Sequence, residues 1–212
     1  MRLRKVKNAK EILQACPIYI EDAKKNKGKW DSVFPKKQSI HLEIGMGKGD
    51  FIIALALSCP EINFIGMEKE SSVLVRAVEK IKDQNIPNLR FICEDASTIE
   101  ELFEKEVEIL YLNFSDPWPK KKHAKRRLTS NNFLTSYDKI FKREACIKLK
   151  TDNIEFFAYS LESLSKHGYT LEKVSLNLEE EDLRNYKTEY EKKFIELGKK
   201  INYVEALKEK NA

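Results

Sequence analysis

The chain has 212 residues, of which 42% are hydrophobic and 34% are charged, and its formal net charge is +5. This composition is typical of one globular domain with a full core and a heavily solvated surface. No run approaches the roughly 18 apolar residues of a membrane span. The basic N-terminus is not followed by the apolar segment of a signal peptide, so we expect a cytoplasmic protein that does not enter a membrane.

Strand-like and helix-like segments alternate along the chain. Apolar strands are expected at residues 39–44, 62–68, 89–95, 107–114 and 145–151. Helices are expected at residues 50–58, 71–84, 97–105, 129–141 and 152–168, with Ser71 or Ser72 as the N-cap of the second. Two further strand-like runs, 169–178 and 201–207, break this rhythm and suit an antiparallel edge.

This alternation predicts an α/β fold with a doubly wound, Rossmann-like sheet. The sheet should contain seven strands, mostly parallel, with helices on both faces, which matches the layout of Rossmann-like methyltransferases. We expect a basic N-terminal extension at residues 1–30 and a single domain at residues 31–212. In such sheets ligands bind at the carboxyl ends of the strands, so functional side chains should lie there.

A glycine-rich loop, LEIGMGKGD, follows the first strand and opens the first helix. Gly45, Gly47 and Gly49 would allow a tight turn and a close approach of a ligand to the backbone. The dinucleotide-binding pattern GxGxxG would require glycine at residue 50, which is Asp50. The spacing therefore disfavours an NAD enzyme and favours S-adenosylmethionine, which has no pyrophosphate, although a plain turn is the simpler alternative.

Acidic residues lie in or at the end of each of the first three strands. Glu68 follows the first glycine by about 20 residues, the usual place of an acceptor for a ribose diol, unless it is only a surface residue. Asp95, followed by Ala96, either accepts from an adenine amino group or caps the next helix. Glu43 lies inside the first strand, where a buried acid is costly, so we expect it to face the methionine end of the ligand.

The fourth strand ends in the run NFSDPWP, which places Asp116 beside the expected ligand site. Pro117 and Pro119 restrict the backbone around it. Trp118 either stacks on a base or plugs the loop. The run is similar to the (N/D)PP(Y/F) loops of nitrogen methyltransferases, whose polar and aromatic groups hold the methyl acceptor.

Positive charge is concentrated in two stretches. Residues 1–29 contain nine Lys/Arg against three acidic residues, and residues 117–137 contain six Lys/Arg and no acidic residue. Basic patches of this kind commonly face phosphates, although a solvated charged face explains a single cluster equally well. The four cysteines form no CxxC pair and the three histidines lie far apart, so we expect reduced thiols and no metal site.

Six motifs occur in order along almost the whole chain: LEIGMGKGDF, GMEKE, EDA, NFSDPWPKKKHAKRR, KTDN and TEYE. Together they resemble the bacterial tRNA (guanine-N7-)-methyltransferases, the TrmB family. The fourth motif is the specific one, because the glycine loop is shared by many enzymes.

The resemblance implies transfer of a methyl group from S-adenosylmethionine to N7 of guanine 46 in the tRNA variable loop. Relatives include both monomers and dimers, so a homodimer is one of two expected states. It implies Asp116 as the catalytic residue. The implied cofactor residues are Glu43, Gly45, Gly47, Gly49, Glu68, Asp95, Ala96 and Asp116. The implied tRNA-binding residues are Lys120, Lys122, His123, Lys125, Arg126, Arg127, Asp152, Thr188, Glu189, Tyr190 and Glu191.

The chemistry of guanine N7 fits these residues, because this nitrogen carries a lone pair and no proton, so no strong base is needed. We therefore expect Asp116 to orient the guanine and stabilise developing positive charge rather than attack. Asp152 and Glu191 are candidates for other contacts to the base edge, and Asp152 alternatively caps the following helix. The basic segment would neutralise tRNA phosphates.

Three alternatives remain at the level of sequence: a methyltransferase acting on protein or on a small molecule, an RNA-binding module with a vestigial pocket, and an NAD enzyme. Arg2, Arg4, Lys5 and Lys7 form either a second clamp on the RNA or only a basic tail.

Overall fold

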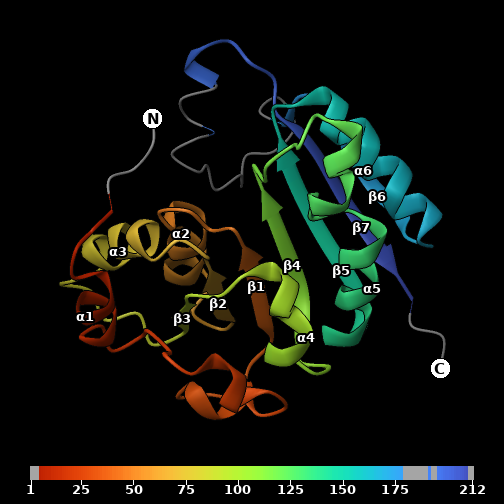
Figure 1. Cartoon of the computed structure of the whole chain (residues 1–212). Coiled ribbons are helices and arrows are strands. Elements are labelled where there is room, and N and C mark those ends of the chain that lie inside the picture. The colour runs from red at the N-terminus through yellow and green to blue at the C-terminus, as the bar shows by residue number, and fades with distance from the viewer. Residues whose placement is uncertain (1–4, 179–190, 192–194, 210–212) are drawn as a thin grey trace.

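The structure is a computed structural model, and it describes residues 5–178, 191 and 195–209. Its centre is a seven-stranded sheet in the order β3-β2-β1-β4-β5-β7-β6 (Figure 1). The strands are β1 (Ile40–Ile44), β2 (Asn63–Met67), β3 (Leu89–Ile92), β4 (Val107–Asn113), β5 (Phe141–Thr151), β6 (Thr170–Ser175) and β7 (Asn202–Lys208).

Six α-helices and four 3₁₀ helices are described around this sheet. The α-helices are α1 (Ala9–Gln14), α2 (Asp50–Ser58), α3 (Ser71–Lys80), α4 (Ile99–Leu102), α5 (Asn131–Ile140) and α6 (Ile154–Lys166). The 3₁₀ helices are η1 (Ala23–Asn26), η2 (Trp30–Val33), η3 (Ala96–Thr98) and η4 (Lys121–Arg126). Of the helices in this part of the chain, none is long and apolar enough to cross a membrane.

The directions of the strands confirm the predicted sheet. Strands β3, β2, β1, β4 and β5 are parallel to one another, whereas β7 runs antiparallel to both β5 and β6. The connections from β1 and from β4 lead to opposite sides of the sheet. The carboxyl ends of these two adjacent strands therefore open a crevice, which is where ligands bind in open α/β sheets.

Helices cover both faces of the sheet, as predicted from the alternating pattern (Figure 1). On one face, Leu42 and Ile65 pack with Leu134 of α5 and Phe156 of α6 in one buried cluster. On the other face, Phe64 belongs to a second cluster with residues of α1, α2 and α3. This arrangement holds the strand ends rigidly between two packed layers.

The N-terminal stretch packs against this core. Ala9 and Leu13 of α1 are buried in the cluster that contains α3, and the backbone N–H of Val6 donates to Ser72 Oγ at 3.0 Å. Trp30 is fully buried, stacks on Phe103 and donates from Nε1 to a backbone carbonyl of α4 at 2.7 Å. The division of the chain at residue 30 stays a prediction.

Several predicted boundaries were wrong for identifiable reasons. The second predicted helix corresponds to α3, which begins after Glu70. The Glu70 carbonyl accepts from the amides of Val73 and Leu74, so neither Ser71 nor Ser72 is the N-cap. It ends at Lys80 rather than residue 84. Strand β5 begins at Phe141, directly after α5, because Phe141 already pairs with β4 before the register shifts.

Candidate active site

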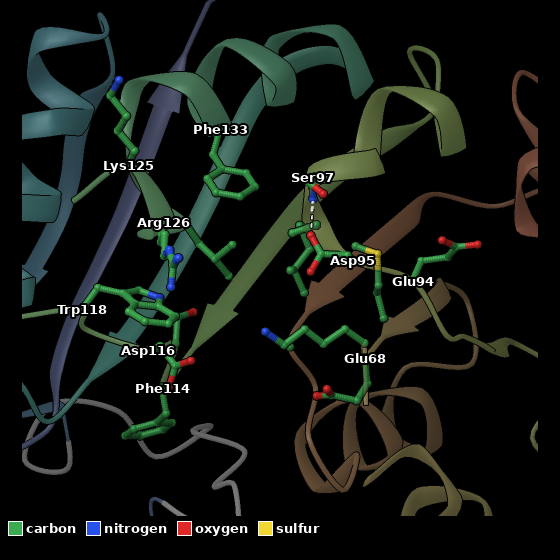
Figure 2. A pocket seen from close by; sticks show the side chains of 17 residues that line it. Glu68, Glu94, Asp95, Ser97, Phe114, Asp116, Trp118, Lys125, Arg126 and Phe133 are labelled. Atoms are coloured by element: carbon green, nitrogen blue, oxygen red, sulfur yellow. Dashed lines mark hydrogen bonds between the residues drawn. The ribbon is translucent and has the colours of Figure 1, made fainter. Parts of the chain in front are cut away.

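A cavity of about 560 Å³ opens at the carboxyl ends of the parallel strands. Gly45, Glu68 and Asp95, from the ends of β1, β2 and β3, line one side of it. Asp116 and Trp118, which follow β4, line the other. Figure 2 shows Asp116 and Trp118 facing Glu68 and Asp95 across this space. Sequence segments far apart thus converge at one site because parallel strands end at the same edge.

The glycine loop has the backbone conformation that its composition predicts. Gly45, Gly47 and Gly49 all have positive φ angles of 74°, 57° and 76°. A Cβ atom on Gly45, which lines the cavity, would meet no atom within 4 Å and would therefore occupy open cavity space. A Cβ on Gly49 would lie 3.0 Å from Cβ of Ala77, so this glycine permits close contact between the loop and α3.

Glu68 is tied to the glycine loop. Its Oε2 accepts from the backbone N–H of Gly47 at 3.1 Å, and its Oε1 accepts from that of Glu70 at 3.0 Å. Burial raises the pKa of this carboxyl, and the two backbone donors oppose that effect. The carboxylate is therefore fixed at the cavity wall, with remaining lone pairs that can accept from hydroxyl groups.

Asp95 caps η3, as one of its two predicted roles required. Its Oδ1 accepts from the backbone N–H of Ser97 at 2.9 Å (Figure 2), and hydrogen bonding from the side chain and then the backbone of Ser97 lowers the pKa of Asp95. Asp95, Ala96 and Ser97 also line the cavity. Capping uses one carboxylate oxygen of Asp95, so the other oxygen can still accept a hydrogen bond from a ligand in the cavity.

Glu43 is not among the residues that line the cavity. Its side chain is 1% exposed, and Oε1 accepts from Nδ2 of Asn113 at 2.8 Å. Oε2 has no hydrogen-bond partner in the described part of the chain. Burial raises the pKa of Glu43 to about 7, although Asn113 and Lys150 act in the opposite direction. A protonated Glu43 is thus accessible near neutral pH.

The turn that carries Asp116 has an uncommon backbone conformation. Phe114 and Trp118, on either side of Asp116, have φ angles of 51° and 40°. A non-glycine residue in this region costs about 1 kcal/mol or more, and such strain is often found at functional sites. Asp116 itself is exposed and lines the cavity.

The predicted basic loop is the 3₁₀ helix η4, which begins beside this turn. Lys125 and Arg126 line the cavity, whereas Lys120 and Lys122 are exposed outside it. The Arg126 guanidinium lies over the Trp118 ring at 4.9 Å. The His123 ring meets the same indole edge-on, with ring centroids 5.7 Å apart. Positive charge and an aromatic surface therefore adjoin Asp116.

Arg127 points differently from its neighbours. It is partly buried, and its Nε and Nη2 donate to the carbonyls of Pro117 and Trp118 at 3.0 and 3.1 Å. Its guanidinium also lies 4.2 Å from the ring centre of Tyr159 in α6. These contacts are within the protein, so the guanidinium is directed away from the surface on which phosphate binding was predicted.

Of the remaining predicted residues, Asp152 and Glu191 are described, and neither lines the cavity. Asp152 forms an ion pair with Lys199 at 3.2 Å, and Asn153, not Asp152, caps α6. The capping alternative for Asp152 was therefore wrong, because the cap lies one residue further along the chain. Thr188, Glu189 and Tyr190 lie outside the described residues.

Glu191 is fully buried, and its Oε2 lies 3.2 Å from Lys150 Nζ. Lys150 is itself buried in β5 and lies 5.0 Å from the ring centre of Phe51. The structure therefore directs this carboxylate to a lysine of the sheet, whereas the sequence suggested a contact to the base edge.

Sequence reasoning missed several residues that line the cavity, including Lys69, Glu94, Phe114 and Phe133. Lys69 and Glu94 adjoin predicted site residues at strand ends, so their positions alone could have indicated them. Phe114 and Phe133 read as core residues of a strand and of an amphipathic helix. Nothing in their spacing distinguishes them from residues that pack inward.

Comparison with known proteins places this site within a family. A sequence model described as "Putative methyltransferase" matches residues 37–204. A tRNA (guanine-N(7)-)-methyltransferase of Limosilactobacillus reuteri is 48% identical over 205 residues, which cover 95% of this chain and 96% of the relative. One of Staphylococcus haemolyticus is 47% identical, with 97% of each chain covered. The chain belongs to the tRNA (guanine-N(7)-)-methyltransferase family.

The fold also matches solved structures at low sequence identity. The structure of a methyltransferase described as antibiotic-related superposes with a TM-score of 0.62 at 18% identity, covering 99% of this chain and 97% of that one. The chain therefore shares the fold of this methyltransferase. The run NFSDPWPKKKHAKRR forms the turn and η4 on the side of the cavity that follows β4.

Proposed function

We propose that this protein transfers a methyl group from S-adenosylmethionine to N7 of guanine 46 in the variable loop of tRNA. The observation that carries the proposal is the convergence of three elements on one cavity: the glycine loop with its strand-end acids, the Asp116 turn, and the basic helix η4. We expect the reaction to take place in the cytoplasm, where tRNA is found.

The residues on the β1–β3 side fit S-adenosylmethionine. Gly45 leaves open space where a side chain would fill the cavity. Glu68 offers fixed acceptors for a pair of ribose hydroxyls, and Asp95 offers an acceptor for an adenine amino group. Glu43 lies behind this wall, where a bound ammonium group would favour its ionised form. When bound, S-adenosylmethionine supplies an electrophilic methyl group on its sulfonium sulfur.

The residues on the β4 side then position the guanine and stabilise the positive charge that develops on it. The N7 lone pair forms the new bond to carbon, the electrons of the broken carbon–sulfur bond remain on sulfur, and the positive charge passes to guanine. No proton moves, so Asp116 need not act as a base. Asp116 can accept from guanine N1–H and the 2-amino group, and its charge stabilises the product-like cation.

The basic segment fits a structured RNA. Lys120, Lys122, Lys125 and Arg126 are exposed and can neutralise phosphates, which positions the substrate without reading its sequence. Guanine N7 lies in the deep major groove of an A-form helix, so the target base has to be exposed before it enters the cavity. The aromatic surface of Trp118 beside Asp116 would suit such an exposed base.

The proposal is tested by incubating purified protein with tRNA lacking modifications and labelled methyl donor, then digesting the tRNA to nucleosides. We expect 7-methylguanosine as the labelled product. Asp116→Ala should abolish most of the label, and Asp83→Asn, which removes an exposed carboxylate outside the cavity lining, should not. Label in another nucleoside, or in added protein but not in tRNA, would overturn the assignment.

A further inference from the structure

The Asp116 turn has fewer backbone hydrogen-bond donors than an ordinary turn, and it holds two residues in an uncommon conformation. Pro117 and Pro119 have no backbone N–H, and Phe114 and Trp118 both have positive φ angles. Neither residue is glycine, so the side chain of each makes a positive φ angle unfavourable. Something outside the turn must therefore fix its shape.

Arg127 meets that need. Its guanidinium presents two adjacent N–H groups, on Nε and Nη2, to the successive carbonyls of Pro117 and Trp118 at 3.0 and 3.1 Å. The planar fork of arginine can satisfy both acceptors at once, which the ammonium of lysine cannot do with the same geometry. One side chain thus joins both carbonyls directly after Asp116.

Arg127 and the residues that follow it contact helix α6. The Arg127 guanidinium stacks 4.2 Å from the centre of the Tyr159 ring. Two residues further along, Thr129 is fully buried, and its Oγ1 lies 2.9 Å from Oγ of the buried Ser160. The Thr129 carbonyl also accepts from Ser163 Oγ at 2.6 Å. The segment that carries Arg127 is therefore anchored to a packed helix.

Arg126 provides the contrast. It is exposed, lines the cavity, and its guanidinium lies over the Trp118 ring. Adjacent arginines of one basic run thus have their charges in different places, one at the cavity and one behind the turn.

We propose that Arg127 is a positioning residue that fixes the Asp116–Trp118 turn, and that it is not a phosphate contact. This inference deepens the proposed function and rests on it for its kinetic consequences, whereas its structural consequence can be measured without any substrate. It revises the expectation that the whole basic run binds tRNA phosphates.

The decisive variant is Arg127→Lys, which keeps the positive charge but loses the fork. We expect kcat to fall about 10- to 100-fold, because a small displacement of Asp116 misaligns the acceptor. We expect tRNA affinity, and the slope of its dependence on salt, to stay within about twofold of wild type. Arg143→Lys makes the same change at an exposed arginine outside the cavity lining and is the matched control, so its kcat should stay close to wild type.

Fluorescence gives a readout of the turn itself. The chain has two tryptophans, and Trp30 is fully buried, so acrylamide quenching reports mainly on Trp118. Arg127→Lys should increase the quenching of the free protein, while calorimetric binding of S-adenosylmethionine stays close to wild type. Wild-type quenching together with wild-type kcat in Arg127→Lys would overturn the proposal. So would a weakened tRNA affinity with a normal kcat.

A second pair of variants leaves every charge in place and covers the case in which Arg127→Lys does not fold. Tyr159→Leu removes the ring beneath the guanidinium and should raise Trp118 quenching and lower kcat about threefold or more. Tyr159→Phe keeps the ring and should match wild type. If Arg127 instead contacted a tRNA phosphate, Tyr159→Leu and Tyr159→Phe should show the same Trp118 quenching and the same kcat. If the wild-type protein made no 7-methylguanosine, the proposed function would fail, but the quenching results would still decide the role of Arg127.

Discussion

Asp116 lines the cavity on the side opposite Glu68 and Asp95. Its carboxylate should act by charge and by accepting hydrogen bonds, so Asp116→Asn, which keeps the shape but not the charge, should lower the single-turnover rate about 100-fold. Rapid-quench measurement of methyl transfer, at saturating donor and tRNA, isolates that step from binding. A variant that keeps a third or more of the wild-type rate would remove Asp116 from the electrostatic role.

Glu43 should make stability depend on pH in an unusual direction. Its pKa is raised to about 7 in the folded protein from a usual value of 4.5, so between these pH values the folded state holds a proton that the unfolded state has released. Stability therefore falls as pH rises through this window, by up to about 3 kcal/mol from this group.

The comparison is with Glu43→Gln, which cannot titrate. Urea unfolding at pH 5 and pH 8, without S-adenosylmethionine, should show the variant gaining about 2 kcal/mol or more relative to wild type at the higher pH. Parallel pH profiles of the two proteins would show that Glu43 is ionised throughout and that the burial argument is wrong.

At the residue scale, the strand-end acids could be predicted because their location follows from the strands alone. Glu68, Asp95 and Asp116 all line the cavity, as parallel strands require. The roles of Arg127 and Glu191 could not be predicted. A basic run gives no sign of which guanidinium turns inward, and an acid near a substrate motif gives no sign of a buried lysine on a distant strand.

At the element scale, β2 supports the glycine loop through a glycine of its own. A Cβ on Gly66 would collide with Sδ of Met46, which belongs to the loop. Gly66→Ala should therefore push Met46 and its neighbours outward, lower the unfolding free energy by about 1–3 kcal/mol and weaken donor binding. Calorimetry of S-adenosylmethionine binding and urea unfolding measure the two effects.

The control for that collision is a double mutant. Met46→Ala removes the obstructing sulfur, so Gly66→Ala should cost much less in that background than in wild type. Equal costs in both backgrounds would mean that the loop does not depend on this contact.

Strand β5 is linked to the segment that contains Glu191 through a buried ion pair with Lys150. Lys150→Met leaves a buried carboxylate without this cation and should lower the unfolding free energy by about 3 kcal/mol. The double variant Lys150→Met/Glu191→Met should recover much of that loss, because it leaves no buried charge at the pair. Chemical denaturation of wild type, Lys150→Met and the double variant measures these free energies. A loss below about 1 kcal/mol in Lys150→Met would show that the Lys150–Glu191 ion pair does not stabilise the fold.

The elements themselves could largely be predicted from hydrophobic periodicity. Helix α2 spans the predicted residues 50–58, and each of the seven predicted strands is present. Helix ends were less predictable, since the start of α3 depends on the Glu70 carbonyl rather than on a capping side chain. The early start of β5 depends on pairing with β4, which is a tertiary contact.

For the whole molecule, the distribution of charge matters more than the net value of +5. Lys125→Glu and Arg126→Glu, both at the cavity, should weaken tRNA binding and reduce its salt slope by about one unit or more each. Lys82→Glu makes the same change of charge on an exposed residue outside the cavity lining, and should alter the slope much less. Filter binding across a salt titration gives the slopes, and equal slopes for all three variants would mean a diffuse electrostatic effect.

The most direct measurement uses two tRNA transcripts that differ by a single atom. One carries guanosine at the variable-loop target and the other carries 7-deazaguanosine there, which replaces N7 by carbon and keeps the rest of the base. The cavity should bind both transcripts with similar affinity, because the groups offered to Asp116 are unchanged, but only the first should be methylated. Equal methyl incorporation into both transcripts would contradict the account.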